Sequence, residues 1–270
     1  MSILKTEMRN PESMNMDKMS TADMASLVIR ANYDAVKAVE NALPAITKAV
    51  DVIANAFENG KRLIYVGAGT SGRLGILDAS ECPPTFGVDN GVVTGIIAGG
   101  EKCVFSAGES EEDGYEDGKR AVQEAGVKEG DVVVGISAAG NAAFVLGAIE
   151  EAKEVGCHTV GLCCNADTNL LKSVDIPVLT DTGAEVLTGS TRLKAGTAQK
   201  IVLNTLTTCA MTKTGKVYEN MMINLSPSNI KLKDRVIRIT SEILSVSEKE
   251  AEIYLENNDW NIKKCIEATK

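Results

Sequence analysis

The sequence predicts an α/β protein, a three-layer α/β/α doubly wound parallel sheet with a small helical bundle at its C-terminal end. Short apolar runs rich in β-branched residues alternate with segments of helical periodicity along residues 61–225. Two of these runs end in loops of small residues. Strands and helices that alternate in this way form a parallel sheet covered on both faces. Ligands bind at the carboxyl ends of such strands.

Residues 1–60 are expected to form an N-terminal helical segment. Residues 1–19 look irregular, and Ser20 begins a motif typical of a helix N-terminus. Apolar residues then recur at steps of three and four from Val39 to Phe57. This spacing predicts an amphipathic helix, with a restart or kink at Pro44.

The first expected strand, residues 63–66, runs into a loop with glycines at positions 67, 69 and 72. Glycines let backbone N–H groups approach a ligand, and the N-terminus of a following helix adds positive potential. Such a loop is suited to a phosphate group. Gly69, Thr70 and Ser71 are therefore candidate phosphate-binding residues.

Two other interpretations of this loop remain open on the residues alone. The glycine spacing also fits a dinucleotide-binding loop, which requires an acidic residue about 20 positions further on. The first acid beyond the next expected strand is Glu101, which is late for that role. Glycine-rich loops are also common as plain turns.

The remaining elements follow the same alternation. Further strands are expected at residues 92–98, 131–136, 158–164 and 176–179. Helices are expected in the acid-rich stretch 101–125 and at residues 142–155, 169–173 and 192–216. Pro83 and Pro84 are expected to stop the helix that follows the glycine-rich loop, just after Glu81.

A second loop of small residues follows the strand at 131–136. Its residues Ser137, Ala138 and Gly140 are candidates for contacts with the same ligand.

The pattern breaks at residues 224–229, which marks a boundary. Residues 226–270 are then expected to form a three-helix bundle, with helices at 236–244, 247–256 and 259–268. Residues 61–225 form the α/β domain in this division of the chain.

Composition limits the classes of partner. The net charge is −9 with no basic block, which argues against nucleic acid and anionic membranes. No window has the roughly 18 apolar residues of a membrane span. The N-terminal residues lack the apolar core of a signal peptide. Seven cysteines without metal-ligand spacing and a single histidine, His158, predict reduced thiols in a cytoplasmic protein, with no metal and no cofactor.

One long stretch carries a resemblance to a known family. It reads Gly67-Ala-Gly-Thr-Ser-Gly-Arg-Leu-Gly-Ile-Leu-Asp-Ala-Ser-Glu-Cys-Pro-Pro-Thr85. This resembles the signature of N-acetylmuramic acid 6-phosphate etherases, which belong to the sugar isomerase (SIS) superfamily. Stretches at 97–101, 111–113, 183–200 and 215–217 also match, so the resemblance covers nearly the whole chain.

The resemblance implies a SIS-type fold and a homodimer with its sites near the subunit contact. It implies cleavage of the lactyl ether of N-acetylmuramate 6-phosphate to N-acetylglucosamine 6-phosphate and D-lactate. Glu81 matches the catalytic acid of the family, and Glu112 matches its second catalytic glutamate, assigned here as the base. The alternative for Glu112 is a solvated helix face, because its neighbours Glu111 and Asp113 are also acidic.

A polar cluster opens the helix expected at 192–216. Glu185, Ser190 and Lys194 are predicted to contact the substrate, and Lys194 is a candidate partner for its charge; a salt bridge at the helix start is the alternative. The second loop departs from the family pattern at Ala139, Asn141 and Ala142, which removes side-chain contacts while keeping backbone donors.

Two rival functions remain. A phosphosugar isomerase of the same superfamily commonly uses a histidine for ring opening, but His158 begins a strand, at the end away from the expected site. The second rival is a non-catalytic phosphosugar sensor resembling the glucokinase regulatory protein. The presence of both Glu81 and Glu112 favours the enzyme.

Overall fold

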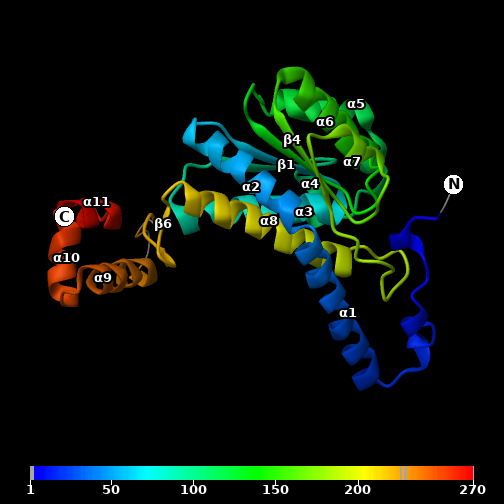
Figure 1. The fold of residues 1–270 in the computed structure, drawn as a ribbon, viewed down its shortest axis with the longest axis horizontal. Helices are drawn as coiled ribbons and strands as arrows, with labels where there is room; N and C mark the ends of the chain where they lie inside the picture. Colours follow the sequence, from blue (N-terminus) through cyan, green and yellow to red (C-terminus); the bar gives the residue numbers. More distant parts are fainter. Residues whose placement is uncertain (1–2, 226, 228–229, 270) are drawn as a thin grey trace.

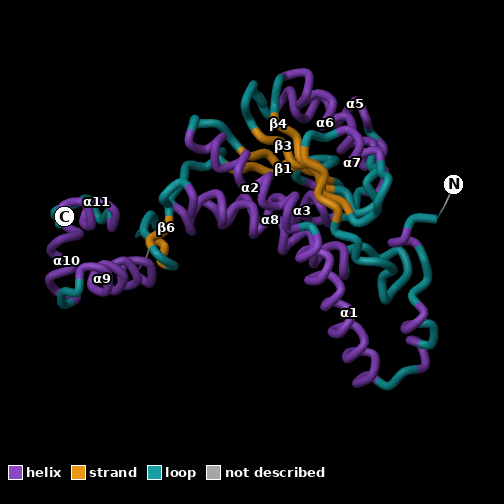
Figure 2. Tube along the Cα trace, viewed as in Figure 1, coloured by secondary structure: helices purple, strands orange, loops and turns teal. Residues whose placement is uncertain are grey.

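A computed structural model describes residues 3–225, 227 and 230–269 of the chain. Five parallel strands form the central sheet in the order β2-β1-β3-β4-β5. The strands are β1 (Leu63–Gly67), β2 (Val93–Ile97), β3 (Val132–Ile136), β4 (His158–Cys163) and β5 (Ile176–Leu179). The predicted fold class is confirmed, and Figure 2 shows the sheet between its helices.

Helices cover both faces of the sheet. One face carries α2 (Leu43–Glu58), α3 (Gly69–Phe86) and α8 (Lys194–Lys213), with α1 (Thr21–Asn41) packed on α8. The other carries α5 (Tyr115–Glu124), α6 (Ala143–Val155) and α7 (Asn169–Ser173). The three layers of the fold follow from this arrangement.

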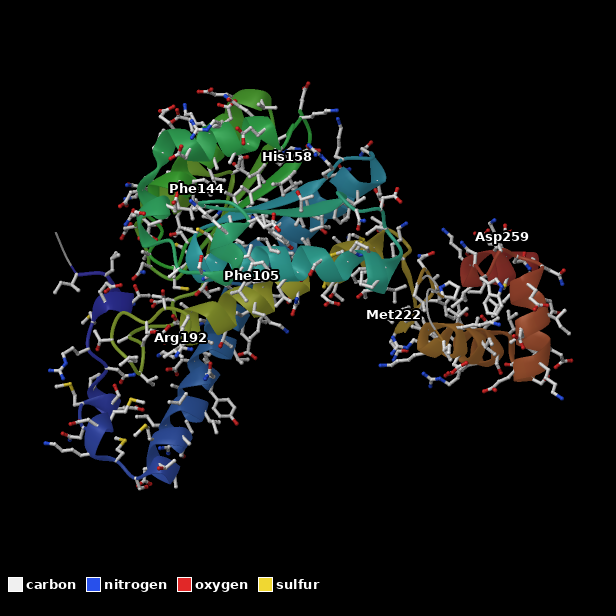
Figure 3. The ribbon with its side chains drawn as sticks, turned by 180° about the vertical axis from the view of Figure 1, so that it is seen from behind. Phe105, Phe144, His158, Arg192, Met222 and Asp259 are labelled. Carbon is white, nitrogen blue, oxygen red and sulfur yellow. The ribbon has the colours of Figure 1, made fainter. Side chains whose placement is uncertain are left out.

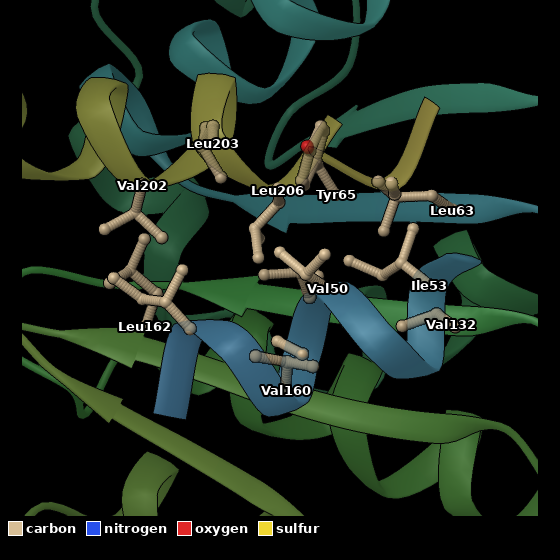
Figure 4. Packing of buried hydrophobic residues seen from close by; sticks show 14 of the residues in the cluster. Val50, Ile53, Leu63, Tyr65, Val132, Val160, Leu162, Val202, Leu203 and Leu206 are labelled. Atoms are coloured by element: carbon tan, nitrogen blue, oxygen red, sulfur yellow. The ribbon is translucent and has the colours of Figure 1, made fainter. Parts of the chain in front are cut away.

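The alternation along β1 explains why both faces are covered. Leu63 and Tyr65 point into the core on the α2–α8 side, whereas Ile64 and Val66 point into the core on the α6 side. All four side chains are buried. Figure 4 shows Ile53 of α2 packing beside Leu63. Full burial of such a side chain contributes about 1.5–3 kcal/mol, so the two cores hold the strand from both sides.

The N-terminal helical pattern is divided in two. α1 ends at Asn41 and α2 begins at Leu43, with Pro44 in the first turn of α2. The restart at Pro44 is confirmed, because proline is tolerated where the backbone N–H has no partner within the helix. Before α1, residues 3–19 contain only three short 3₁₀ turns, η1 (Lys5–Glu7), η2 (Pro11–Ser13) and η3 (Met16–Lys18).

The expectation that Pro83 and Pro84 stop the helix is wrong. α3 continues through both prolines to Phe86. Each proline removes one backbone donor, so α3 loses two hydrogen bonds near its C-terminal end and still continues. Gly87 then closes the helix in a left-handed conformation, with its N–H donating to the carbonyl of Pro83 at 2.9 Å.

The acid-rich stretch does not form one continuous helix. It divides into α4 (Lys102–Phe105), the 3₁₀ turn η4 (Glu109–Asp113) and α5. Glycines at 108 and 114 flank η4, so the chain turns there. This break exposes Glu112 at a loop rather than along a helix face.

Three helices follow the α/β part, as expected. They are α9 (Ile230–Leu244), α10 (Glu248–Glu256) and α11 (Ile262–Ala268), and they share a core of their own. α9 begins six residues earlier than expected, and a hairpin of β6 (Val217–Tyr218) and β7 (Met221–Met222) precedes it. Figure 1 shows these helices at one end of the molecule and α1 extending at the other. Ser226, Ser228 and Asn229 of the expected boundary lie outside the described residues, and the domain limits stay a prediction.

Candidate active site

The loops that follow the neighbouring strands β1 and β3 lie side by side at the carboxyl edge of the sheet. Gly67 at the end of β1 pairs with Ile136 at the end of β3. The chain continues from β1 to the outer strand β2 on one side, and from β3 to β4 on the other. This reversal of direction is the switch point where open α/β sheets bind ligands.

A cavity of about 760 Å³ opens at this switch point. Its walls come from Glu7, the first turn of α3, the 107–113 segment, the loop after β3, and Gly189, Thr191 and Arg192. Segments far apart in the sequence therefore share one site.

The floor of the cavity is the first turn of α3. Gly67 and Gly72 are required for the close packing of this turn, because a Cβ on Gly67 would lie 2.6 Å from the Gly72 nitrogen. Gly69 has φ +52°, a left-handed conformation that glycine adopts without strain. Gly69, Thr70 and Ser71 all line the cavity. They form the N-terminal turn of α3, where the backbone N–H groups lack partners within the helix.

Ser71 is held from behind by α8. Its side chain is buried, and its hydroxyl donates a hydrogen bond to Oε1 of Gln199 at 3.0 Å. The sequence did not single out Gln199.

The loop after β3 forms the opposite wall. Ser137 and Ala138 line the cavity. Gly140 does not, but its N–H donates to the Ser137 hydroxyl oxygen at 3.0 Å, and its φ of +76° closes the turn. Gly140 therefore shapes the loop.

The three departures from the family pattern also line the cavity: Ala139, Asn141 and Ala142. Asn141 accepts a hydrogen bond from the backbone N–H of Asn169 at 3.2 Å, so it ties the loop to the start of α7.

Of the predicted glutamates, Glu112 lines the cavity and Glu81 does not. Glu81 is an exposed residue of α3, eight positions beyond the cavity-lining Arg73. At about 1.5 Å per residue, that separation is about 12 Å along the helix axis. Within one chain the two glutamates do not share the cavity.

The residues predicted to contact the substrate at the start of α8 instead contact other parts of the protein. The buried Glu185 carboxylate accepts hydrogen bonds from the N–H groups of Lys194 and Ala195, each at 2.9 Å, so it caps α8. The Lys194 ammonium group is buried and lies 3.1 Å from Asp34 of α1. Glu185, Lys194 and Ser190 do not line the cavity.

Two arginines supply positive charge instead. Arg73 lines the cavity while its guanidinium donates to the carbonyl oxygens of Cys103, Val104 and Ser106 at 2.7–2.8 Å. Arg192 is exposed at the cavity wall. Sequence reasoning missed Arg73 as a cavity residue; its place in the glycine-rich motif is the signal that could have found it.

The N-terminal residues also reach the cavity, which their irregular sequence did not reveal. Thr6 is fully buried, and Asn165 Nδ2 donates both to its hydroxyl and to the carbonyl of Ala138, each at 3.0 Å. This bond holds the segment against the loop after β3, and it places Glu7 in the wall.

The histidine and the cysteines lie outside this site. His158 is exposed at the start of β4, whereas the cavity lies at the carboxyl ends of β1 and β3. Figure 3 shows His158 and Arg192 on opposite sides of the α/β part. Burial raises the pKa of Cys82 and of Cys164 to about 12, so these thiols stay protonated as core residues. Within the described ranges, no cluster of His, Cys, Asp and Glu side chains has the arrangement of a metal site. None of the helices described is long and apolar enough to cross a membrane.

Curated proteins of known family match this chain over almost its full length. An N-acetylmuramic acid 6-phosphate etherase of Caldanaerobacter subterraneus subsp. tengcongensis is 48% identical over 97% of this chain and 86% of the relative. One of Yersinia pestis is 46% identical over 97% of this chain and 89% of the relative. The chain belongs to the N-acetylmuramic acid 6-phosphate etherase family.

Domain families and solved structures agree with this membership. Residues 45–153 match the N-terminal SIS domain of the glucokinase regulatory protein, and residues 113–209 match the SIS domain. A phosphoheptose isomerase of Francisella tularensis superposes with a TM-score of 0.55 at 18% identity, over 72% of this chain and 100% of that one. A phosphoheptose isomerase of Neisseria gonorrhoeae superposes with a TM-score of 0.50 at 20% identity, over 71% of this chain and 96% of that one. These two likenesses support the fold of this etherase-family chain.

Proposed function

We propose that this protein cleaves the D-lactyl ether of N-acetylmuramate 6-phosphate, giving N-acetylglucosamine 6-phosphate and D-lactate. Near-full-length identity of 46–48% to etherases carries the proposal. The cavity at the switch point supports it, because a helix N-terminus rich in glycine and hydroxyl groups shares that cavity with Glu112.

The chemistry needs two groups that transfer protons and no metal. In the open-chain sugar, C2 lies next to an aldehyde, so its proton is acidic. A base removes that proton, an acid protonates the departing lactyl oxygen at C3, and the C3–O bond breaks. Water then adds across the C2–C3 double bond, with a proton returning to C2. Positioned carboxyl groups can perform these transfers.

The first turn of α3 binds the phosphate in this proposal. Gly69, Thr70 and Ser71 line the cavity there, with their backbone N–H groups at the helix N-terminus and the hydroxyl of Thr70 beside them, and Ser137 lines it from the second loop. Arg192 supplies a full positive charge at the same cavity. Charge-assisted hydrogen bonds of this kind are about twice as strong as neutral ones.

Glu112 is the base in this proposal. Its position on η4 brings an exposed carboxylate to the cavity wall across from the α3 turn. A phosphosugar held by its phosphate would extend its C2 toward that wall.

Glu81 is the acid, and we propose that a second copy of the chain brings it to the cavity. The face of α3 that bears Arg73 at the cavity continues through Leu77 to Glu81, at helical steps of four, and Leu77 and Glu81 are both exposed. Phe105 lies beside this face and is 88% exposed. An acid on the same helix face as an exposed apolar side chain fits an interface between subunits.

α1 carries a second exposed apolar surface. Ile29, Tyr33 and Val36 form a stripe at helical spacing, and Ile29 and Tyr33 are each more than 60% exposed. A homodimer would bury this stripe and place each Glu81 near the cavity of the partner. We also propose a cytoplasmic location, where the seven free cysteines would stay reduced.

Incubation of the purified protein with N-acetylmuramate 6-phosphate, with assays for both products, tests the function. Release of D-lactate supports it. The match to the glucokinase regulatory protein favours a phosphosugar-binding regulator as the second candidate. Tight phosphosugar binding without turnover would support that regulator, and conversion of fructose 6-phosphate would indicate an isomerase.

A further inference from the structure

Gln199 lies directly behind the phosphate-binding turn and has an unsatisfied amide. Its side chain is 1% exposed, on α8. Oε1 accepts the hydrogen bond from Ser71 at 3.0 Å. Nε2 is buried and has no hydrogen-bond partner among the residues that the structure describes. A buried donor without a partner is rare in folded proteins and needs an explanation.

The direction of this hydrogen bond determines what Ser71 offers to the cavity. A serine hydroxyl has one proton to donate. Here that proton points to Gln199, so Ser71 presents only lone pairs to a ligand. Lone pairs repel the oxygens of a phosphate group, and Ser71 in this state does not assist binding.

A half-turn of the Gln199 amide reverses the bond. Nε2 then donates to the Ser71 oxygen, and the hydroxyl proton of Ser71 is free to donate to a phosphate oxygen. The same rotation gives the unpaired Nε2 an acceptor and leaves Oε1 without its donor, so the net gain is the hydrogen bond from Ser71 to the phosphate. Rotation about this terminal bond exchanges two groups of nearly equal size, so the surrounding core does not have to move.

We propose that Gln199 is a positioning residue that turns the Ser71 hydroxyl into a donor when a phosphate occupies the cavity. The inference rests on the proposed phosphosugar site. Gln199 does not line the cavity, so its effect on the ligand passes through Ser71. Glutamine suits this role because its amide can either accept or donate, whereas glutamate only accepts and leucine does neither.

Calorimetric titration measures the effect without requiring turnover. The probes are N-acetylglucosamine 6-phosphate and N-acetylglucosamine. Gln199→Leu should weaken binding of the phosphosugar by about threefold, because the Ser71 oxygen loses the donor that holds its hydroxyl toward the phosphate. Gln199→Glu should weaken it by about a hundredfold, because a carboxylate holds the Ser71 proton and repels the phosphate. Binding of the unphosphorylated sugar should change in neither variant.

A double-mutant cycle distinguishes positioning from general damage to the helix pair. In a Ser71→Ala background, Gln199→Leu should cause no further loss of phosphosugar affinity. Asn204→Ala is the matched control, because the Asn204 amide also joins α8 to α3, through Asp78 at 2.6 Å, away from the cavity. It should leave phosphosugar affinity unchanged.

Equal losses from Gln199→Leu in the wild-type and Ser71→Ala backgrounds would overturn the inference while leaving the proposed function intact. So would a loss for Asn204→Ala as large as that for Gln199→Leu. If Gln199→Leu does not fold, Gln199→Glu against Ser71→Ala gives the decision: full phosphosugar affinity in Gln199→Glu overturns the inference. A wild-type protein that binds neither sugar would instead overturn the phosphosugar site, and the inference with it.

Discussion

Glu111 and Glu112 are neighbours in the chain, but they line different cavities. Glu112 lines the cavity at the switch point of the sheet. Glu111 lines a separate cavity of about 700 Å³ beside β2 and lies 3.4 Å from the ammonium group of Lys102. The tight 3₁₀ turn η4 separates them, because successive side chains in such a turn point about a third of a turn apart.

This separation predicts opposite outcomes for two matched substitutions. Glu112→Gln should lower kcat for lactate release by about 10²–10⁴-fold, the usual contribution of a general base. Glu111→Gln makes the same change in size and charge at the neighbouring position and should have little effect on kcat. Steady-state kinetics decides the matter, and the reverse result would show that Glu111 is the base.

Mixing two inactive variants tests whether Glu81 acts across a subunit contact. Glu81→Gln and Glu112→Gln should each be inactive alone. After the two are mixed and allowed to exchange subunits, half of the dimers contain one of each variant. Every such dimer has one site with both glutamates intact, so about a quarter of wild-type activity should return.

No recovery from a mixture shown to contain the mixed dimer would mean that Glu81 and Glu112 act from the same chain. Light scattering supplies the control, because it reports whether the protein is a dimer. Tyr33→Glu, in the exposed stripe of α1, should shift that dimer toward monomer.

Ser71→Ala should weaken binding of phosphorylated sugars by about tenfold, through loss of a hydrogen bond to a charged group. Affinity for unphosphorylated sugars should be unchanged, because only the phosphate reaches the α3 turn. Ser80→Ala is the control on the same helix, since the Ser80 hydroxyl donates to the carbonyl of Leu77 at 2.8 Å and does not line the cavity. Equal losses for both kinds of sugar would contradict a phosphate-binding role for Ser71.

Acid should remove stability that depends on Asp131. Burial of this carboxylate raises its pKa, but hydrogen bonds from Arg62 and from the backbone of Lys128 outweigh that effect and hold the pKa below its usual value. A carboxylate with a lowered pKa in the folded state stabilises the protein above about pH 4, and this stabilisation is lost as the pH falls further.

Asp131→Asn should therefore cost about 1–3 kcal/mol at pH 7, the usual effect of breaking a buried charge-assisted hydrogen bond. Urea unfolding at pH 7 and pH 3 measures it. The difference between wild type and variant should shrink at pH 3, and a constant difference would contradict the role of the charge.

The sequence alone predicted the sheet and the glycine-rich turn between β1 and α3, because both depend on local patterns. The strand at residues 63–66 and the glycines after it specify backbone geometry over a few residues. Gly69, Thr70 and Ser71 could be selected for that reason. Pro83 and Pro84 were misjudged because the local cost of proline in a helix was taken to decide where α3 ends, whereas the helix continues through both to Phe86.

Contacts between distant segments could not be predicted in this way. Glu185 has the sequence context of a substrate-binding residue, yet it caps α8, and only the folded chain shows that. Thr6 meets Asn165 across 159 residues, with no local signal on either side. Glu81 was proposed as the catalytic acid from family resemblance alone, because its position on an exposed helix face gives no sign of such a role.

The source of the oxygen in the products tests the proposed reaction most directly. The protein is incubated with N-acetylmuramate 6-phosphate in water enriched in ¹⁸O, and the ¹⁸O content of both products is measured by mass spectrometry. Elimination followed by water addition predicts D-lactate without added ¹⁸O and a new labelled hydroxyl at C3 of the sugar. Label in the lactate, or no release of lactate, would contradict it.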